Sequence, residues 1–148
     1  MASIDDVRRL VALDHGLASL STIRRDGSVH TTVVNAGVIA HPVSGAAVTA
    51  FVGRAGTVKL QHLRAHPAAT LCWRSGWAWA TVEGAVELIG PDDPHDGISP
   101  PGLGLLLRAI YTAAGGDEHE DWPEYDRVMA TERRVAVLLT PRRIYVNP

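Results

Sequence analysis

The spacing of apolar residues changes its period along the chain, and each period predicts a different element. Near the amino terminus, apolar residues recur at helical spacing between Val7 and Val11, which predicts a short helix framed by Ser3 and Gly16. Residues 17–39 then alternate between apolar and polar positions on both sides of Asp26-Gly27. That dipeptide is typical of the tight turn in a β-hairpin, so we expect two antiparallel strands here.

Further apolar runs predict more strands. The run 46–53 is apolar at nearly every position, which is typical of a strand buried on both faces. Within the run 77–90, we expect Trp77 and Trp79 to share one strand face and Gly84 to mark a bend or bulge. The predicted strands after the hairpin are 46–53, 69–75, 77–90 and, on either side of a turn at Pro141, 134–140 and 142–148.

Helical patterns interrupt this strand series twice. A short helix is expected before Pro67, and two helices around Gly115-Gly116 form a helical insertion at about 103–131. A proline- and glycine-rich loop is expected from Pro91 to Pro101. Six or more strands joined mostly by hairpins predict a mostly β fold with helices (α+β), a barrel or sandwich. A length of 148 residues suits a single domain spanning 1–148.

Composition narrows the class of protein. The formal net charge of -2 gives no electrostatic reason to expect binding to nucleic acid or to a membrane surface. No segment approaches the roughly 18 apolar residues that a membrane-spanning helix needs. Cys72 is the only cysteine, and residues 1–10 carry acidic side chains where a secretion signal is basic and then apolar. We therefore expect a cytoplasmic protein without disulfides.

The stretch RAGTVKLQHLRAHPAA, residues 54–69, carries the strongest candidate chemistry. A helix amino terminus exposes unpaired backbone N–H groups and partial positive charge, and Thr57 adds a hydroxyl there. Lys59 opposes the helix dipole unless an anion binds beside it, and Arg54 is a second cation nearby. These residues alone leave two interpretations equally open: a phosphate site, or a capped surface helix with Lys59 in water.

Other candidate groups are weaker. His62 and His66 have the i, i+4 spacing of some zinc ligands, but no acid or cysteine stands at a suitable distance, so we expect no metal site. The tryptophan cluster is expected to fill a core, with a wall for a flat ring as the alternative. Cys72 is expected to be a buried small apolar residue rather than a thiolate. The sequence lacks a recognisable catalytic triad, which favours chemistry carried by a cofactor.

Two segments resemble a known family. Residues 56–73, GTVKLQHLRAHPAATLCW, resemble the strand–turn–helix of the flavin reductase-like, pyridoxamine phosphate oxidase-type split β-barrels. The matching positions are Gly56, Thr57, Lys59, Leu63, Arg64 and Pro67, followed by Val82, Glu83 and Gly84 in the next strand. Residues 110–146 are similar to the tail of the actinobacterial deazaflavin oxidoreductases of class B, which use coenzyme F420.

The resemblance implies an antiparallel split β-barrel that forms a homodimer with two cofactor sites at the subunit interface. It places Thr57, Lys59 and the backbone N–H of Val58 at the cofactor phosphate, and Arg54 beside an anionic side chain of the cofactor. The residues that it places around the cofactor ring are Phe51, Val52, Thr32 and Asn35 from one subunit and Trp77, Ala78 and Trp79 from the partner.

The resemblance also implies a function. We expect hydride transfer from reduced F420 to a small electron-poor acceptor such as an enone, a quinone or a tetrapyrrole. The flavin-using oxidases usually carry arginine where this chain has Val58, glutamine near Trp79 and asparagine near His62. These departures favour F420 over FMN. The alternatives are an FMN-dependent oxidase or reductase, and a non-catalytic carrier of F420 or of haem, with His41 or His66 as axial ligand.

Overall fold

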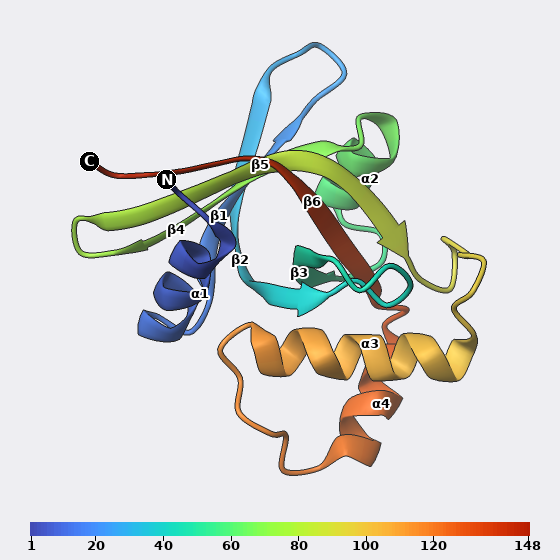
Figure 1. Cartoon of the computed structure of the whole chain (residues 1–148). Coiled ribbons are helices and arrows are strands. Elements are labelled where there is room, and N and C mark those ends of the chain that lie inside the picture. Colours follow the sequence, from blue (N-terminus) through green and yellow to red (C-terminus); the bar gives the residue numbers. More distant parts are fainter.

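The computed structural model describes residues 1–148 as six strands and four helices (Figure 1). The helices are α1 (Ile4–Leu13), α2 (Val58–Ala65), α3 (Pro100–Ala113) and α4 (Trp122–Thr131). The strands are β1 (Leu17–Ile23), β2 (Val29–Ala40), β3 (Ala47–Gly53), β4 (Ala68–Ser75), β5 (Ala78–Ile89) and β6 (Val135–Val146). None of the four helices is both long and apolar enough to cross a membrane.

The strands form one closed antiparallel barrel in the order β1-β2-β3-β6-β5-β4. The predicted hairpin is confirmed: Ile23 pairs with Val29 across the turn that contains Asp26-Gly27. Gly27 has a φ of 88°, a conformation that favours glycine. A second turn, residues 41–46, joins β2 to β3, and its Gly45 N–H donates to the His41 carbonyl oxygen at 2.9 Å. The sequence-based expectation of an antiparallel barrel is therefore correct.

One apolar core fills the barrel. Phe51 and Trp73 are among its largest fully buried side chains, and the indole N–H of Trp73 donates to the carbonyl oxygen of Ala36 at 3.0 Å. This confirms the core-filling interpretation for Trp73. The helices α1 and α2 add side chains to the same core, Leu60 and Leu63 from α2 among them.

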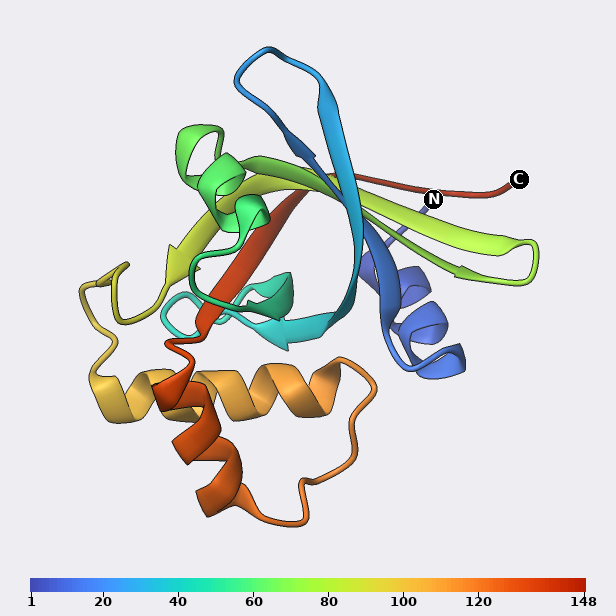
Figure 2. The same ribbon diagram turned by 180° about the vertical axis from the view of Figure 1, so that it is seen from behind.

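A second core lies outside the barrel, where α3 and α4 cover one side of it (Figure 2). Leu106, Leu107 and Ile110 of α3 pack there with Tyr125 of α4. Their partners on the barrel are Ile39, Val48, Ala50, Ile89, Ala136 and Leu138. The predicted helical insertion is thus a layer packed on β2, β3 and β6.

The two strands predicted around Pro141 are wrong: the structure has the single strand β6 instead. The pairing with β5 shifts register between Glu83 and Gly84, and Gly84 lies opposite Pro141. A Cβ on Gly84 would stand 1.9 Å from the Thr140 carbonyl oxygen, so only glycine fits this bulge. Proline has no N–H to donate to the ladder, and the irregularity accommodates it within a continuous strand.

Two further boundaries differ from the prediction. Trp77 lies in the turn before β5 and not on the strand face of Trp79, and 95% of it is exposed. The helix α3 begins at Pro100, inside the predicted loop. Ser99 caps that helix by accepting a hydrogen bond from the Gly102 N–H at 3.2 Å. Proline is tolerated in the first helical turn, where its missing N–H would have no helical partner.

Candidate functional site

A cavity of about 550 Å³ lies where α2, α3 and α4 meet the middle of β2 and the end of β3. We call it the first cavity. Its polar lining includes Asn35, Lys59 and Arg134. The other lining residues are His15, Val33, Val34, Val52, Ile110, Tyr111, Ala114, Gly115, Gly116, Tyr125 and Met129. One mainly apolar and aromatic wall therefore faces two cations.

Lys59 is the only lysine in the chain, and it has no carboxylate within ion-pair distance. Partial burial lowers the pKa of Lys59 below its usual value, and the charge of Arg134 lowers it further. Both causes disfavour the charged ammonium as long as no anion lies beside it. A bound anion would remove this penalty, which makes the position suited to a phosphate or a carboxylate.

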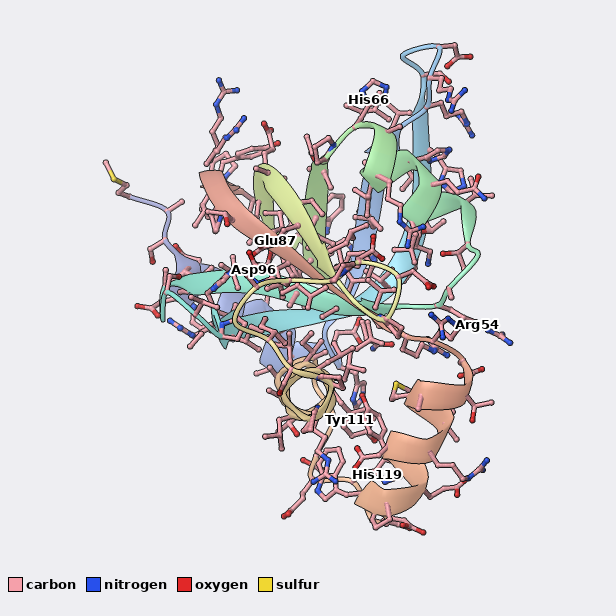
Figure 3. All side chains as sticks on the ribbon, turned by 90° about the vertical axis from the view of Figure 1, so that its right-hand side faces the viewer. Arg54, His66, Glu87, Asp96, Tyr111 and His119 are labelled. Atoms are coloured by element: carbon pink, nitrogen blue, oxygen red, sulfur yellow. The ribbon has the colours of Figure 1, made fainter.

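One carboxylate stands near these cations, and it is shared. Glu132 accepts from Arg134 at 3.0 Å and lies 3.4 Å from the guanidinium of Arg54. Arg54 extends into solvent above α4 (Figure 3). Three cations against one anion leave a net charge of about +2 when every group is ionised. This end of the first cavity is therefore electropositive.

The amino terminus of α2 adds to that positive potential. Thr57 is the N-cap residue, yet its side chain accepts no capping bond; its hydroxyl donates to the Arg54 carbonyl oxygen at 2.9 Å. The N–H groups of the first turn are thus without a capping side chain and remain available to an anion. Gly56 has a φ of 80°, which a residue with a side chain rarely adopts, and it turns the chain into the helix.

The aromatic side of the cavity is held rigidly. Tyr111 makes edge-to-face contacts with Tyr125 and Trp122, with ring centroids 5.2 and 5.8 Å apart. His119 lies 5.3 Å from the Tyr111 ring, and both project between α3 and α4 (Figure 3). The Tyr125 hydroxyl donates to the Leu107 carbonyl oxygen at 2.9 Å. Such contacts fix ring orientation, so this wall is preformed.

Close backbone contacts fix the rim where α3 ends. A Cβ on Gly37 of β2 would stand 2.2 Å from the Ala113 carbonyl oxygen, and a Cβ on Gly115 would stand 2.4 Å from the backbone of His15. Asn35 donates from its side chain to the His15 carbonyl oxygen at 2.8 Å. The end of α3, β2 and the turn before β1 are therefore in direct backbone contact.

The predicted site residues fall into three groups. Asn35, Val52 and Lys59 line the first cavity. Arg54, Thr57 and Val58 surround the start of α2 beside it, with Val58 51% exposed. Phe51 is buried in the barrel core, and Trp77, Ala78 and Trp79 lie at the β4–β5 turn, on the far side of the barrel from α2 (Figures 1 and 2). Within a single chain, Trp77, Ala78 and Trp79 do not line the first cavity.

Thr32 has a distinct place. Its hydroxyl oxygen is buried and has no hydrogen-bond partner, and the same holds for Nδ1 of His30 two residues earlier. Thr32 is not among the residues that line the first cavity, so its predicted contact with the cofactor ring stays a prediction.

The histidines do not form a metal centre. Nδ1 of His62 lies 3.0 Å from the Thr22 hydroxyl, and burial lowers the pKa of His62. His66 is exposed at the end of α2. No group of three or more histidine, cysteine, aspartate or glutamate side chains has the arrangement to hold a metal ion. Neither His41 nor His66 lines the first cavity, so neither is placed to ligate haem there.

Sequence reasoning missed Arg134, Tyr111 and Tyr125 as lining residues. The sequence offered one signal for Arg134: two consecutive arginines, Arg133 and Arg134, stand directly before the buried strand β6. The signal is weak without the fold, because only the β3–β6 pairing brings the start of β6 beside the end of β3: Gly53 pairs with Val135.

No protein-family model matches the sequence. A conserved hypothetical protein of Mycobacterium tuberculosis superimposes with a TM-score of 0.71 at 22% identity, covering 99% of this chain and 84% of the other. A pyridoxamine 5'-phosphate oxidase-related, FMN-binding protein of Nostoc punctiforme gives 0.66 at 16% identity, with 96% and 79% covered. An F420 reductase gives 0.58 at 18% identity, with 91% and 93% covered. The chain therefore has the fold of the pyridoxamine 5'-phosphate oxidase-like, FMN-binding split β-barrels.

Proposed function

We propose that this protein is an F420-dependent oxidoreductase that transfers hydride from the reduced deazaflavin to a small electron-poor organic acceptor, such as an enone, a quinone or a tetrapyrrole. One observation carries the proposal. The only lysine of the chain, Lys59, lies partly buried and without a carboxylate partner, in the same cavity as Arg134 and at the start of α2. That arrangement suits the phosphate of a cofactor.

The phosphate would be held by Lys59, by the Thr57 hydroxyl and by the first N–H groups of α2. The Thr57 hydroxyl donates to the Arg54 carbonyl oxygen, so it would reach the phosphate through a bridging water or by turning its O–H toward a phosphate oxygen. Arg54 lies beside this site and is 63% exposed, which suits a flexible anionic extension of the cofactor. Arg134 adds positive charge to the same cavity.

The cofactor ring would lie against the apolar and aromatic wall. Val34, Val52 and Met129 offer apolar contact, and Tyr111 offers a ring edge fixed by its neighbours. When bound, reduced F420 would supply the hydride. The side chains of this chain would orient ring and acceptor in near-attack contact and exclude water from them.

Val58 supports F420 rather than FMN. It occupies the position where the FMN-using relatives usually carry arginine, and it is half exposed at the start of α2. Without that arginine, the protein has one fewer cation to bind the phosphate of FMN. F420 has further anionic groups that Arg54 could bind.

A homodimer completes the proposed site. Four large apolar side chains stand on the outer face of the β1–β2 hairpin and remain between 36% and 67% exposed: Leu17, Ile23, Val29 and Val33. Exposed apolar groups gathered on one sheet face are typical of a protein interface. Val33 also lines the first cavity, so the cavity opens on this face. A second copy packed there would bring its Trp77, Ala78 and Trp79 to the ring.

The test compares cofactors and then acceptors. F420 should bind in the micromolar range or tighter and FMN at least tenfold more weakly, measured by fluorescence titration. Reduced F420 bound to the protein should then be oxidised faster by menadione, a quinone, than reduced F420 in buffer. Binding without faster oxidation, tried also with an enone and with biliverdin, would identify a carrier. Absence of F420 binding at micromolar concentrations would refute the proposal.

A further inference from the structure

A second cavity, of about 930 Å³, lies between the segment 90–101, one side of α3 and the end of α4. Met129 and Arg134 line both this cavity and the first, so the two lie back to back. The proposed function gives the second cavity no role. Its lining contains features that packing does not explain.

The first such feature is Gly104, which stands inside α3 and lines the second cavity. Glycine inside a helix is destabilising relative to alanine. Gly37 is required by a close backbone contact, but a Cβ on Gly104 would meet no atom within 4 Å, and its φ is not in the left-handed region. The missing side chain leaves the helix backbone open to the cavity, where a flat group can approach it closely.

The remaining apolar walls suit a planar ring. Pro91, Pro94, Pro100 and Pro101 all line the cavity. Proline has no backbone N–H, so these walls present flat faces that donate no hydrogen bonds. Leu103 lies next to Gly104 and extends the apolar surface.

The polar part of the lining supplies hydrogen-bond donors. It holds Arg108, Arg133 and Arg134 against the single carboxylate of Asp126. A carboxylate pairs with each of these guanidinium groups: Arg108 donates to Asp126 at 2.9 Å, Arg133 to Asp92 at 3.2 Å and Arg134 to Glu132 at 3.0 Å. A guanidinium has five N–H donors, so each retains donors after such a pairing. The arginines therefore present hydrogen-bond donors that these pairings hold in position.

We propose that the second cavity binds a planar aromatic carboxylate or sulfonate. Its ring would lie over Gly104 between the proline walls, and its anionic group would accept hydrogen bonds from the arginines. This inference does not depend on F420 binding, because it concerns a different cavity, which shares only Met129 and Arg134 with the first.

The probe is 1-anilinonaphthalene-8-sulfonate, followed by fluorescence on the full chain. Wild type should bind one probe per chain, saturably. Gly104→Trp fills the cavity and should weaken binding at least tenfold, whereas Gly104→Ala should stay within about twofold of wild type. Naphthalene-2-carboxylate should displace the probe, and hexanoate at the same concentration should not. Circular dichroism melts show whether each variant is folded.

A second pair of variants keeps the test decisive if Gly104→Trp fails to fold. Leu105 lines the second cavity and Leu13 lies on α1, and each is 65% exposed. Leu105→Glu should weaken probe binding at least fivefold and Leu13→Glu should not. The proposal is overturned by unsaturable binding, by equal affinity of the Leu105 and Leu13 variants, or by loss of the probe in Lys59→Ala, which would place it in the first cavity.

Discussion

Lys59 and Arg134 line one cavity although they lie far apart in the sequence, and the charge of Arg134 lowers the pKa of Lys59. Two like charges held together, one of them partly buried, are unfavourable without a counter-ion. Glu132 neutralises only part of this charge, since it is shared between Arg134 and Arg54. The proposed anion site depends on this excess of positive charge, so changing the charge of Glu132, Arg134 or Lys59 should change the affinity for an anion.

Glu132 and Arg134 should have opposite effects on the affinity for an anion. Glu132→Gln removes the local negative charge and should tighten binding of a phosphate-bearing ligand about twofold to fivefold, because electrostatic effects at partly exposed sites are on the order of 1 kcal/mol or less. Arg134→Gln should weaken it by a similar or larger factor. Isothermal titration with F420 at low salt measures both. A Glu132→Gln variant that binds more weakly would contradict the electrostatic explanation.

Substitution by alanine should change the free energy of unfolding in opposite directions at Gly37 and at Gly104. Gly37→Ala would push the end of α3 away from β2, because its Cβ would stand 2.2 Å from the Ala113 carbonyl oxygen. We expect a loss of about 2 kcal/mol or more in the free energy of unfolding. Gly104→Ala meets open space inside a helix and should gain about 0.5–1 kcal/mol. Urea unfolding of the two variants measures the difference, and equal effects would contradict it.

The outer face of the β1–β2 hairpin should carry the subunit interface. Val29 is 61% exposed on that face and does not line the first cavity. Val29→Asp should shift the protein from a dimer to a monomer of 15.8 kDa and should also weaken F420 binding. Leu13→Asp is the matched control, with 65% exposure on α1. Sedimentation equilibrium decides: a wild-type monomer, or a Val29→Asp dimer, contradicts the proposed interface.

Tyr125 should make stability depend on alkaline pH. Burial raises the pKa of Tyr125 to about 12, above the usual 10.0. The unfolded chain therefore loses this proton first, so the stabilisation is complete below pH 10 and is lost as the pH rises toward 12. Between about pH 9 and about pH 11 the free energy of unfolding should fall about 1 kcal/mol more in wild type than in Tyr125→Phe. Urea unfolding at both pH values tests this prediction. An equal fall in the free energy of unfolding in wild type and in Tyr125→Phe would contradict it.

Local signals predicted the parts of the fold that depend on neighbouring residues. The Asp26-Gly27 turn, the helix start at Thr57 and the irregularity at Gly84 are each encoded in a few consecutive residues. The strand break at Pro141 was wrong because the reason for continuity is not local. Gly84 lies opposite Pro141 across the β5–β6 pair, and its missing side chain makes room for the Thr140 carbonyl.

The same distinction separates the predicted and the missed parts of the site. Lys59 and Thr57 belong to one recognisable motif, and Lys59 does line the cavity with Asn35 and Val52. Arg134 and Tyr111 reach it only because β6 pairs with β3 and α3 packs on β2. The roles of Trp77 and Trp79 depend on a second subunit, and they stay predictions.

The most direct test of the proposed cofactor site is a fluorescence titration of F420 with Lys59→Ala beside wild type. Arg25→Ala is the control, because Arg25 is an exposed cation near the tip of the β1–β2 hairpin and forms no ion pair. Loss of a charge-assisted phosphate contact should cost about 1.5–3 kcal/mol, so Lys59→Ala should bind F420 roughly ten- to a hundredfold more weakly while Arg25→Ala binds as wild type. Equal affinity of Lys59→Ala and wild type would mean that Lys59 is an ordinary solvated lysine.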